Sequence, residues 1–283
     1  MKSVILSIAI LLYNEISVAQ SVGIGTTSPH SSAQLDINST TKGLLPPRMN
    51  LAQRNAIATP AAGLIIWCID CDELQVYNGT IWKNMKGAAA CVVVSFPNVS
   101  ICNQVWMVKN LNVSTYRNGD SIPKVTDPTT WAALTTGAWC WYNNDSATYA
   151  DTYGKLYNWY AMNDSRGLAP PGWHKPTDEE WTTLTTCLGG ETVSGGPMKE
   201  DGTSHWFSPN TGATNSSGFT GLPGGYRSSN GTFYVNGSHG YWWSSTEFDA
   251  ATAWFYNLYY NFAFTGRNLN PKTMGFSVRC IRD

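Results

Sequence analysis

Residues 218–283 constrain the fold of this chain more than any other part of the sequence. Large aromatic side chains alternate there with glycines, often paired, and charged residues are few. Glycine permits tight turns, and aromatic side chains surrounded by turns favour short strands over long helices. Segments of this kind carry recognition surfaces more often than catalytic sites. We therefore expect short strands and tight turns at this end of the chain.

The first residues predict export. Met1-Lys2 gives a positive start, residues 4–13 are apolar but too short to span a bilayer, and Ser17-Val18-Ala19 offers small residues for cleavage. We expect a signal peptide over 1–19, cut after Ala19, with an uncleaved anchor helix as the alternative. No second apolar stretch follows, so we expect no transmembrane segment and a secreted or cell-surface location in a Gram-negative bacterium.

The composition of the chain argues against two classes of binding partner. Charged residues make up 13% of the chain and the formal net charge is −1. Nucleic acid and anionic membrane both attract clustered Lys and Arg, so neither is an expected partner. Seven cysteines in an exported chain indicate disulfides rather than thiol catalysis, and an odd count leaves one unpaired or shared with another chain.

The distribution of tryptophan divides the chain. Residues 20–86 contain two tryptophans, whereas the remaining eleven of the thirteen follow residue 92. We expect a β-rich assembly or fibre-like segment over 20–86, a linker and first strand over 87–101, and a second domain over 102–283. The short strands of the first segment cannot bury a core alone, which predicts a homo-oligomer formed through it.

Within the first segment, local signals predict one helix and one hairpin. Asn50 and Gln53 fit a helix cap before residues 51–57. Residues 63–67 and 74–82 fit two hairpin strands, with Cys68 and Cys71 in the turn between them. A Cys68–Cys71 disulfide across that turn is the favoured interpretation. A redox or zinc site is the alternative, although no second Cys/His pair at zinc spacing accompanies it.

Several short motifs in this segment resemble the N-terminal part of exported bacterial surface and tail-fibre-like proteins. They are Ser28-Pro29, Leu35-Asp36, residues 42–49 (KGLLPPRM) and residues 75–80 (QVYNGT). The resemblance covers about a quarter of the chain. It implies a trimer-forming or fibre-forming role.

Three helices are expected in the second domain. Asp127 before Pro128 suits a helix start, because aspartate caps free amides and proline fits the first turn. A second helix is predicted over 153–162. The third begins at Thr177, which forms a capping box with Glu180, and ends at Gly189-Gly190. The side chains predicted to be buried on these helices are Trp131, Leu134, Leu156, Trp159, Tyr160, Trp181, Leu184 and Leu188.

Two strands are predicted to bound this domain. Residues 104–113 alternate apolar and polar side chains, which points Val105 and Met107 inward, with Leu111 as a third. In the final strand, Phe276, Val278 and Cys280 alternate in the same way.

Residues 104–282 resemble the Fibrobacter succinogenes major paralogous domain. The matching segments are 104–107 with Asn110-Leu111, 154–160, Gly172-Trp173-His174 with Glu180-Trp181, 222–227, 241–247 and 275–280. The resemblance implies an α+β fold related to C-type-lectin-like and formylglycine-generating-enzyme-like domains, with short twisted antiparallel strands and two to three helices. It also implies a disulfide between Cys187 and Cys280. Among the other cysteines we favour Cys102–Cys140 and leave the remaining pairings open.

A candidate recognition face follows from the strand predicted over 253–262. Alternation puts Trp254, Tyr256, Leu258, Tyr260 and Phe262 on one face and Phe255, Asn257, Tyr259 and Asn261 on the other. The predicted ligand-binding residues, for a surface glycan or protein, are Asn257, Tyr259, Asn261, Arg267, Asn268 and Asn270. The alternative is a strand packed on both faces.

The sequence gives weaker signals for metal binding and for acid–base catalysis. Calcium-dependent sugar binding needs several hard oxygens around one ion, and Ser208-Pro209-Asn210 lacks the carboxylate of the usual motif. We expect no metal or cofactor, with calcium as the alternative. Candidate acids and bases are Glu179, Glu180, Glu247, Asp249, His174, His205 and His239, but their spacing forces no two of them together. His174 is expected to be a core histidine bonded to the backbone.

The sequence therefore predicts a non-catalytic, adhesin-like surface module. A structural subunit of an extracellular fibre or matrix is the alternative. A carbohydrate-active or formylglycine-generating-like enzyme is the third possibility.

Overall fold

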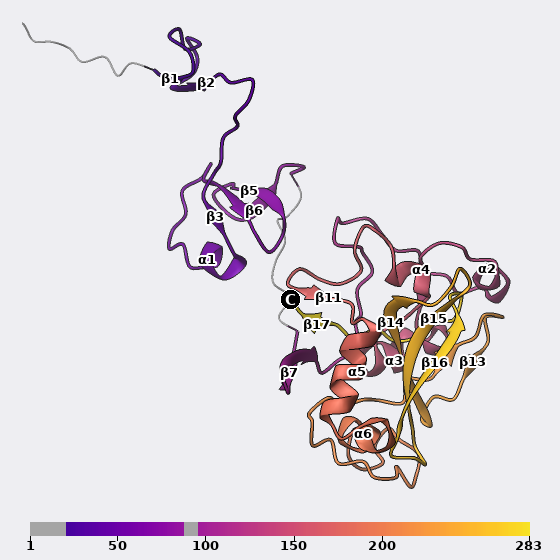
Figure 1. Ribbon diagram of the computed structural model, residues 1–283. Coiled ribbons are helices and arrows are strands. Elements are labelled where there is room, and N and C mark those ends of the chain that lie inside the picture. The colour runs from indigo at the N-terminus through magenta and orange to yellow at the C-terminus, as the bar shows by residue number, and fades with distance from the viewer. Residues whose placement is uncertain (1–20, 88–95) are drawn as a thin grey trace, which may run out of the picture. The chain divides into compact units, whose positions relative to one another are not determined.

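The computed structural model describes residues 21–87 and 96–283 (Figure 1). Contacts divide the chain into two compact units, Met1–Ala90 and Cys91–Asp283, and each is described by itself. The signal peptide predicted over 1–19 lies outside the described residues. Within the described ranges, no helix is long and apolar enough to cross a membrane.

Unit 1 contains a parallel strand pair and a four-stranded sheet. Its strands are β1 (Val22–Ile24), β2 (Leu35–Ile37), β3 (Arg48–Met49), β4 (Ile65–Cys68), β5 (Glu73–Tyr77) and β6 (Trp82–Asn84). β1 pairs with β2, and the sheet order is β3-β4-β5-β6. Val22, Ile24 and Leu35 remain 56%, 54% and 52% exposed, so the β1–β2 pair covers none of these apolar side chains by itself.

The local predictions for unit 1 are largely confirmed. Helix α1 spans Leu51–Asn55, and Asn50 forms a capping box with Gln53 as expected. β4 and β5 form the predicted hairpin. The strand predicted over 74–82 is interrupted, because Asn78 accepts hydrogen bonds from the amides of Thr80 and Ile81 and turns the chain.

The predicted Cys68–Cys71 disulfide is wrong. Cys68 is a buried free thiol, whereas Cys71 is disulfide-bonded elsewhere. The two sulfur atoms lie 3.0 Å apart as a hydrogen-bonded contact. Burial raises the pKa of the Cys68 thiol, so this cysteine has little thiolate character.

Unit 2 is an α+β domain built from small sheets and short helices. The strands are β7 (Asn98–Ile101), β8 (Gln104–Met107), β9 (Trp139–Cys140), β10 (Leu156–Tyr157), β11 (Trp173–His174), β12 (Tyr226–Arg227), β13 (Phe233–Tyr234), β14 (His239–Glu247), β15 (Thr252–Tyr259), β16 (Thr265–Pro271) and β17 (Ile281–Arg282). The helices are α2 (Pro128–Ala132), the 3-10 turn η1 (Tyr142–Asn144), α3 (Ser146–Tyr153), α4 (Trp159–Met162), α5 (Asp178–Cys187) and α6 (Glu191–Met198).

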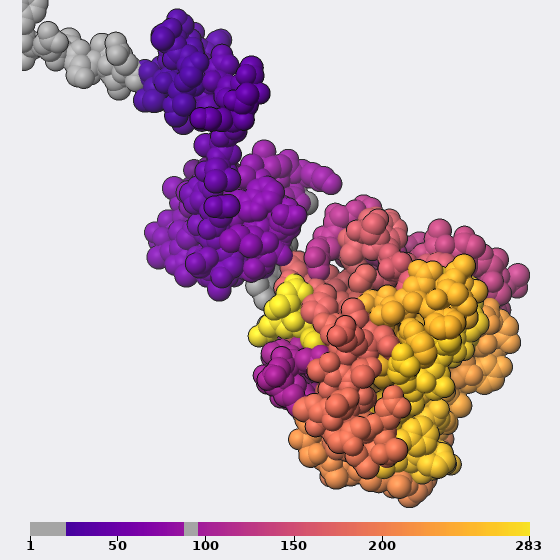
Figure 2. All heavy atoms as spheres, viewed as in Figure 1, coloured from indigo at the N-terminus to yellow at the C-terminus, as the bar shows by residue number. Residues whose placement is uncertain are grey.

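Two sheets organise this unit. β17 lies between β11 and β8, in the order β11-β17-β8-β7, so the last strand closes against the first hairpin of the domain. β14, β15 and β16 form an antiparallel sheet with β15 in the centre. Helix α5 contacts β14 and β15, and α6 contacts β16. On the face shown in Figure 2, the atoms of both helices lie beside those of this sheet.

Strands β14 and β15 bury side chains on both faces of this sheet. Trp243 and Phe255 pack into one hydrophobic cluster, which includes Phe276. The neighbouring residues Trp242 and Tyr256 point the other way, into a second cluster with the side chains of α5. Side chains that alternate along β14 and β15 therefore point into two different hydrophobic clusters, and neither set faces solvent.

The helix predictions succeed where a cap is present. Asp127 caps α2, and Thr177 with Glu180 forms the predicted capping box of α5. The single helix predicted over 153–162 is wrong. Gly154 adopts φ +71°, which ends α3 and leads into β10. α2 to α6 also exceed the two to three helices expected.

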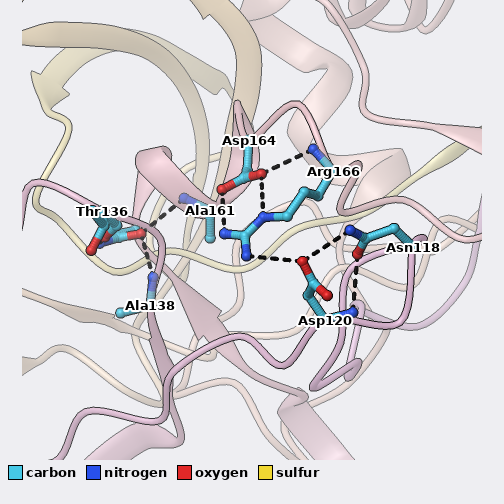
Figure 3. Close-up of polar contacts among 8 residues, drawn as sticks. Asn118, Asp120, Thr136, Ala138, Ala161, Asp164 and Arg166 are labelled. Atoms are coloured by element: carbon cyan, nitrogen blue, oxygen red, sulfur yellow. Dashed lines mark hydrogen bonds and ion pairs between the residues drawn. The ribbon is translucent and has the colours of Figure 1, made fainter.

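Asn158 explains the separate start of α4. Its buried side-chain Oδ1 accepts hydrogen bonds from the amides of Ala138 and Ala161, both at 3.0 Å, and its Nδ2 donates to the Thr136 carbonyl at 2.8 Å. Figure 3 shows these three partners converging on one amide. One side chain thus caps α4 and holds the loop before β9.

The predicted disulfides of unit 2 are also wrong. Cys102, in the β7–β8 turn, bonds to Cys187 at the end of α5. Cys280 points into the first hydrophobic cluster and Cys140 into a third, while the buried residues of α5 belong to the second. Burial raises the pKa of both free thiols to about 12.

Candidate functional site

The structure does not gather the predicted ligand-binding residues into one patch. Asn257 is only 1% exposed, because it lies on the central strand of the sheet. Its cross-strand partner on β16 is Gly266, and a Cβ at that position would clash with the Asn257 side-chain amide. The predicted exposure of Asn257 is therefore wrong.

Arg267 lies on the opposite face of the sheet from Asn268 and Asn270. It donates hydrogen bonds from Nε and Nη2 to the Asp178 carboxylate at 2.8 and 2.6 Å, and its guanidinium lies 3.6 Å from the Trp254 ring centroid. This bidentate pair fixes β16 to the first turn of α5. Asn268 is exposed and Asn270 is half-buried, opposite Ala253 at the far end of the sheet.

Tyr259 and Asn261 do lie close together, at the turn between β15 and β16. Here the structure places an aromatic cluster that we call the aromatic tip, consisting of Phe207, Tyr259, Tyr260, Asn261, Phe262 and Phe264. The ring centroids of Tyr259, Phe262 and Phe264 are 5.1 to 6.1 Å apart. Phe262 is 47% exposed and Phe207 is 57% exposed. Solvent-exposed aromatic rings at this density are typical of binding surfaces.

A buried lysine holds the aromatic tip. Lys199, fully buried, donates hydrogen bonds from Nζ to the carbonyls of Tyr259, Phe262 and Thr211, at 3.0, 2.9 and 2.8 Å. Burial lowers the pKa of Lys199 to about 8. The β15–β16 turn is therefore tied to an internal cation at both of its ends.

Helix α6 and the Phe207 loop complete the support. The amide of Gly196 donates to the Ala263 carbonyl at 3.1 Å, and the amide of Thr211 donates to the Tyr260 carbonyl at 2.7 Å. A Cβ at Gly195 would collide with the carbonyl oxygen of Phe264, so only glycine permits this approach. The tip is thus held by backbone contacts from two other segments.

Sequence reasoning missed Phe207, Phe264 and Lys199 and assigned Phe262 to the opposite face. Phe207 comes from a loop distant in sequence from the strand, and no local pattern links it to Tyr260, whose ring centroid lies 6.3 Å away. A lysine inside a polar stretch normally signals solvent, so the anchoring role of Lys199 had no sequence signal.

The structure brings two of the candidate acids and bases, His174 and Glu180, into contact. His174 bonds to two carboxylates, Glu180 and Asp283, each at 2.7 Å, so the predicted backbone partner is wrong. His205 bonds to Glu200, and His239 to Ser238. Glu247 bonds to Lys272. Asp249 accepts from the amides of Ala251 and Thr252.

In the part of the chain that the structure describes, no group of three or more His, Cys, Asp or Glu side chains has the spacing of a metal site. Some charged side chains at the surface of unit 2 form small networks of ion pairs. Figure 3 shows one of them, in which Arg166 lies between Asp164 and Asp120.

These features define a two-part protein, with a small β-rich N-terminal unit and an α+β domain that carries an aromatic tip. Residues 99–282, more than half of the chain, match the model of the Fibrobacter succinogenes major domain, and the chain belongs to that family. Residues 23–101 match a phage tail like trimerisation region. No curated protein and no solved structure matches the chain. The expected kinship with C-type-lectin-like folds stays a prediction.

Proposed function

We propose that this protein is an exported, oligomeric surface protein whose second unit binds a glycan or protein ligand through the aromatic tip. The two family matches support the coarser statement, a surface or fibre-like protein that oligomerises through its N-terminal segment. The binding role depends on one observation, the exposed aromatic cluster anchored by Lys199. A rigid aromatic surface loses little conformational entropy when it binds.

The tip has the chemistry of a surface that recognises sugars or protein side chains. Phe207 and Phe262 expose apolar rings, while Asn261 beside them supplies an amide donor and acceptor. No charged side chain belongs to the tip, which favours a neutral ligand surface. Stacking against a ring and hydrogen bonding to an amide can act together at this position.

The test is glycan-array and cell-surface binding of residues 20–283. Phe262→Ala and the double variant Tyr259→Ala/Asn261→Ala are expected to lose binding by about tenfold or more, since buried aromatic contacts at interfaces often exceed about 1 kcal/mol. Phe248→Ala is the matched control. Phe248 is 56% exposed but lies at the β14–β15 turn, at the opposite end of β15. Equal loss in the control would contradict a role for the tip.

A structural role in a fibre or matrix is the second candidate. It is supported by the match to the trimerisation region and by the exposed apolar residues of the β1–β2 pair. Ordered oligomers in analytical ultracentrifugation, with no binding on any array, would favour it. Ile24→Asp with Leu35→Asp is expected to dissociate these oligomers. Val193→Asp, a change at an exposed apolar residue of unit 2, is expected to leave them intact.

A further inference from the structure

A groove lined by both polar and apolar groups lies on unit 2, apart from the aromatic tip. Two adjoining cavities of about 340 and 370 Å³ share Lys109, Asn110, Asp151 and Thr152 in their walls. The first also reaches Glu200, His205, Leu222 and Arg279. Volumes of this size fall in the range of small-ligand sites. The walls come from the segment after β8, the end of α3 and the loop after α6.

The floor of the groove is rigid. Arg279 is 1% exposed, and its Nη2 donates to Asn110 Oδ1 at 2.9 Å. The same oxygen accepts from Trp242 Nε1 at 2.8 Å, and Asn110 Nδ2 donates to the Tyr153 carbonyl at 2.9 Å. These side chains have their partners within the protein, so a ligand meets a preformed surface rather than a collapsing one.

One wall presents an oriented imidazole. Both carboxylate oxygens of Glu200 lie 2.9 Å from His205 Nδ1, and the Tyr153 ring packs edge-on against the imidazole with centroids 5.9 Å apart. Nε2 of His205 has no hydrogen-bond partner among the residues that the structure describes. This atom is therefore a fixed polar group available to a ligand.

The charges of the groove balance. Lys109 and Arg279 contribute two cations, and Asp151 and Glu200 contribute two anions. A ligand with a net charge of either sign would face two like charges, whereas a hydroxyl group donates to carboxylates and accepts from cations equally well. Val108 and Leu222 add apolar walls that suit the C–H faces of a sugar ring.

We propose that this groove is a second binding site, specific for a neutral saccharide. Asp151 and Glu200 accept hydrogen bonds from its hydroxyl groups, Lys109 donates to them, and the apolar walls contact the ring. The site is separate from the aromatic tip, and its existence does not depend on ligand binding there.

The experiment uses saturation-transfer NMR and calorimetry with residues 20–283 and four neutral probes: lactose, maltose, cellobiose and diacetylchitobiose. At least one probe is expected to bind. Asp151→Asn and Glu200→Gln are each expected to weaken it by about tenfold or more, because each removes a charged acceptor. Asp151 is exposed, so its variant tests the site even if Glu200→Gln misfolds.

Two control variants separate the sites. Glu191→Gln changes an exposed carboxylate outside the groove, and Phe262→Ala changes the tip; both are expected to leave saccharide binding unchanged. Binding lost in Phe262→Ala but kept in Asp151→Asn would overturn the proposal and assign the sugar to the tip. Failure of all four probes would also overturn it. So would tighter binding of sialyllactose, because its carboxylate gives it a net negative charge.

Discussion

Lys199 Nζ donates a hydrogen bond to the carbonyl of Phe262 at 2.9 Å, from a side chain that solvent does not reach. This bond connects the interior of unit 2 to the exposed aromatic turn between β15 and β16. Lys199→Met is expected to destabilise the domain by about 2–4 kcal/mol, because it leaves three buried carbonyls without their donor. It should also weaken ligand binding at the tip, measured on the same array as Phe262→Ala.

Lys155→Met is the matched control for that change. Lys155 is also buried, also bonds to a carbonyl, that of Asn112, and has its pKa lowered to about 8 by burial and by Lys124. Its loss is expected to lower the free energy of unfolding without altering binding at the tip. Equal binding defects in both variants would mean that stability alone, not anchoring, controls the tip.

His174 predicts how stability depends on pH. Burial alone would lower its pKa, but hydrogen bonds to Glu180 and Asp283 outweigh burial and raise the pKa above 6.5. A raised folded-state pKa stabilises the fold fully below about pH 6.5, and this contribution is lost as the pH rises through the folded-state value. Urea unfolding of His174→Gln from about pH 5 to pH 9 should lack this decline.

His239 is expected to change stability with pH in the opposite direction to His174. Burial lowers its pKa, so the contribution of His239 to stability increases as the pH rises through its folded-state value toward 6.5. His239→Gln should therefore remove a rise with pH, whereas His174→Gln removes a fall. The same slope change in both variants would contradict the assigned environments.

The Cys102–Cys187 bridge closes a long loop, since its cysteines are 85 residues apart. Cys187→Ser and Cys102→Ser are each expected to cost about 4 kcal/mol through the gain in unfolded-state entropy. Cys280→Ala should cost about 1 kcal/mol, since it removes only a buried sulfur. Peptide mapping should recover the 102–187 pair. A bridged peptide joining Cys187 to Cys280 would refute it.

Asn158, which is buried, and Asn118, which forms exposed hydrogen bonds, offer a paired test of burial. Asn158→Ala is expected to cost about 2–4 kcal/mol, because it leaves the buried amides of Ala138 and Ala161 without their acceptor and the Thr136 carbonyl without its donor. Asn118→Ala, which removes exposed hydrogen bonds to Asp120, should change stability by less than about 0.5 kcal/mol. Thermal and urea unfolding of both variants would compare them. Similar losses would contradict the burial argument.

Local signals predicted much of the secondary structure. The caps at Asn50, Asp127 and Thr177 all form, because capping depends on residues within one turn. The break at Gly154 was missed, since an apolar pattern continues across it and only the backbone angle reveals the turn. The predicted disulfide pairs were wrong for a similar reason. Which hydrophobic cluster each cysteine packs into depends on the whole fold and not on nearby residues.

The residues that carry the family resemblance say little about the aromatic tip. Trp106, Asn158, Arg227 and Trp243 are all fully buried and Arg279 nearly so, and their hydrogen-bond partners are backbone groups or the side chains of Gln104 and Asn110. They preserve the fold. The aromatic tip instead combines segments that lie far apart in sequence, while the groove includes Asn110 and Arg279 from the matched segments. Alternation along one strand could not predict that Asn257 is buried or that Arg267 is bound to Asp178.

The exposed apolar residues of β1 and β2 have a consequence for how strongly the protein adheres. If several chains assemble to cover them, one particle carries several tips. Once one tip is bound, the next binds at a high effective concentration, and the resulting avidity can exceed the single-site affinity by about 10²–10⁴. A tip with weak affinity for a lone ligand would then still hold a surface densely coated with it, and would release isolated molecules that diffuse past.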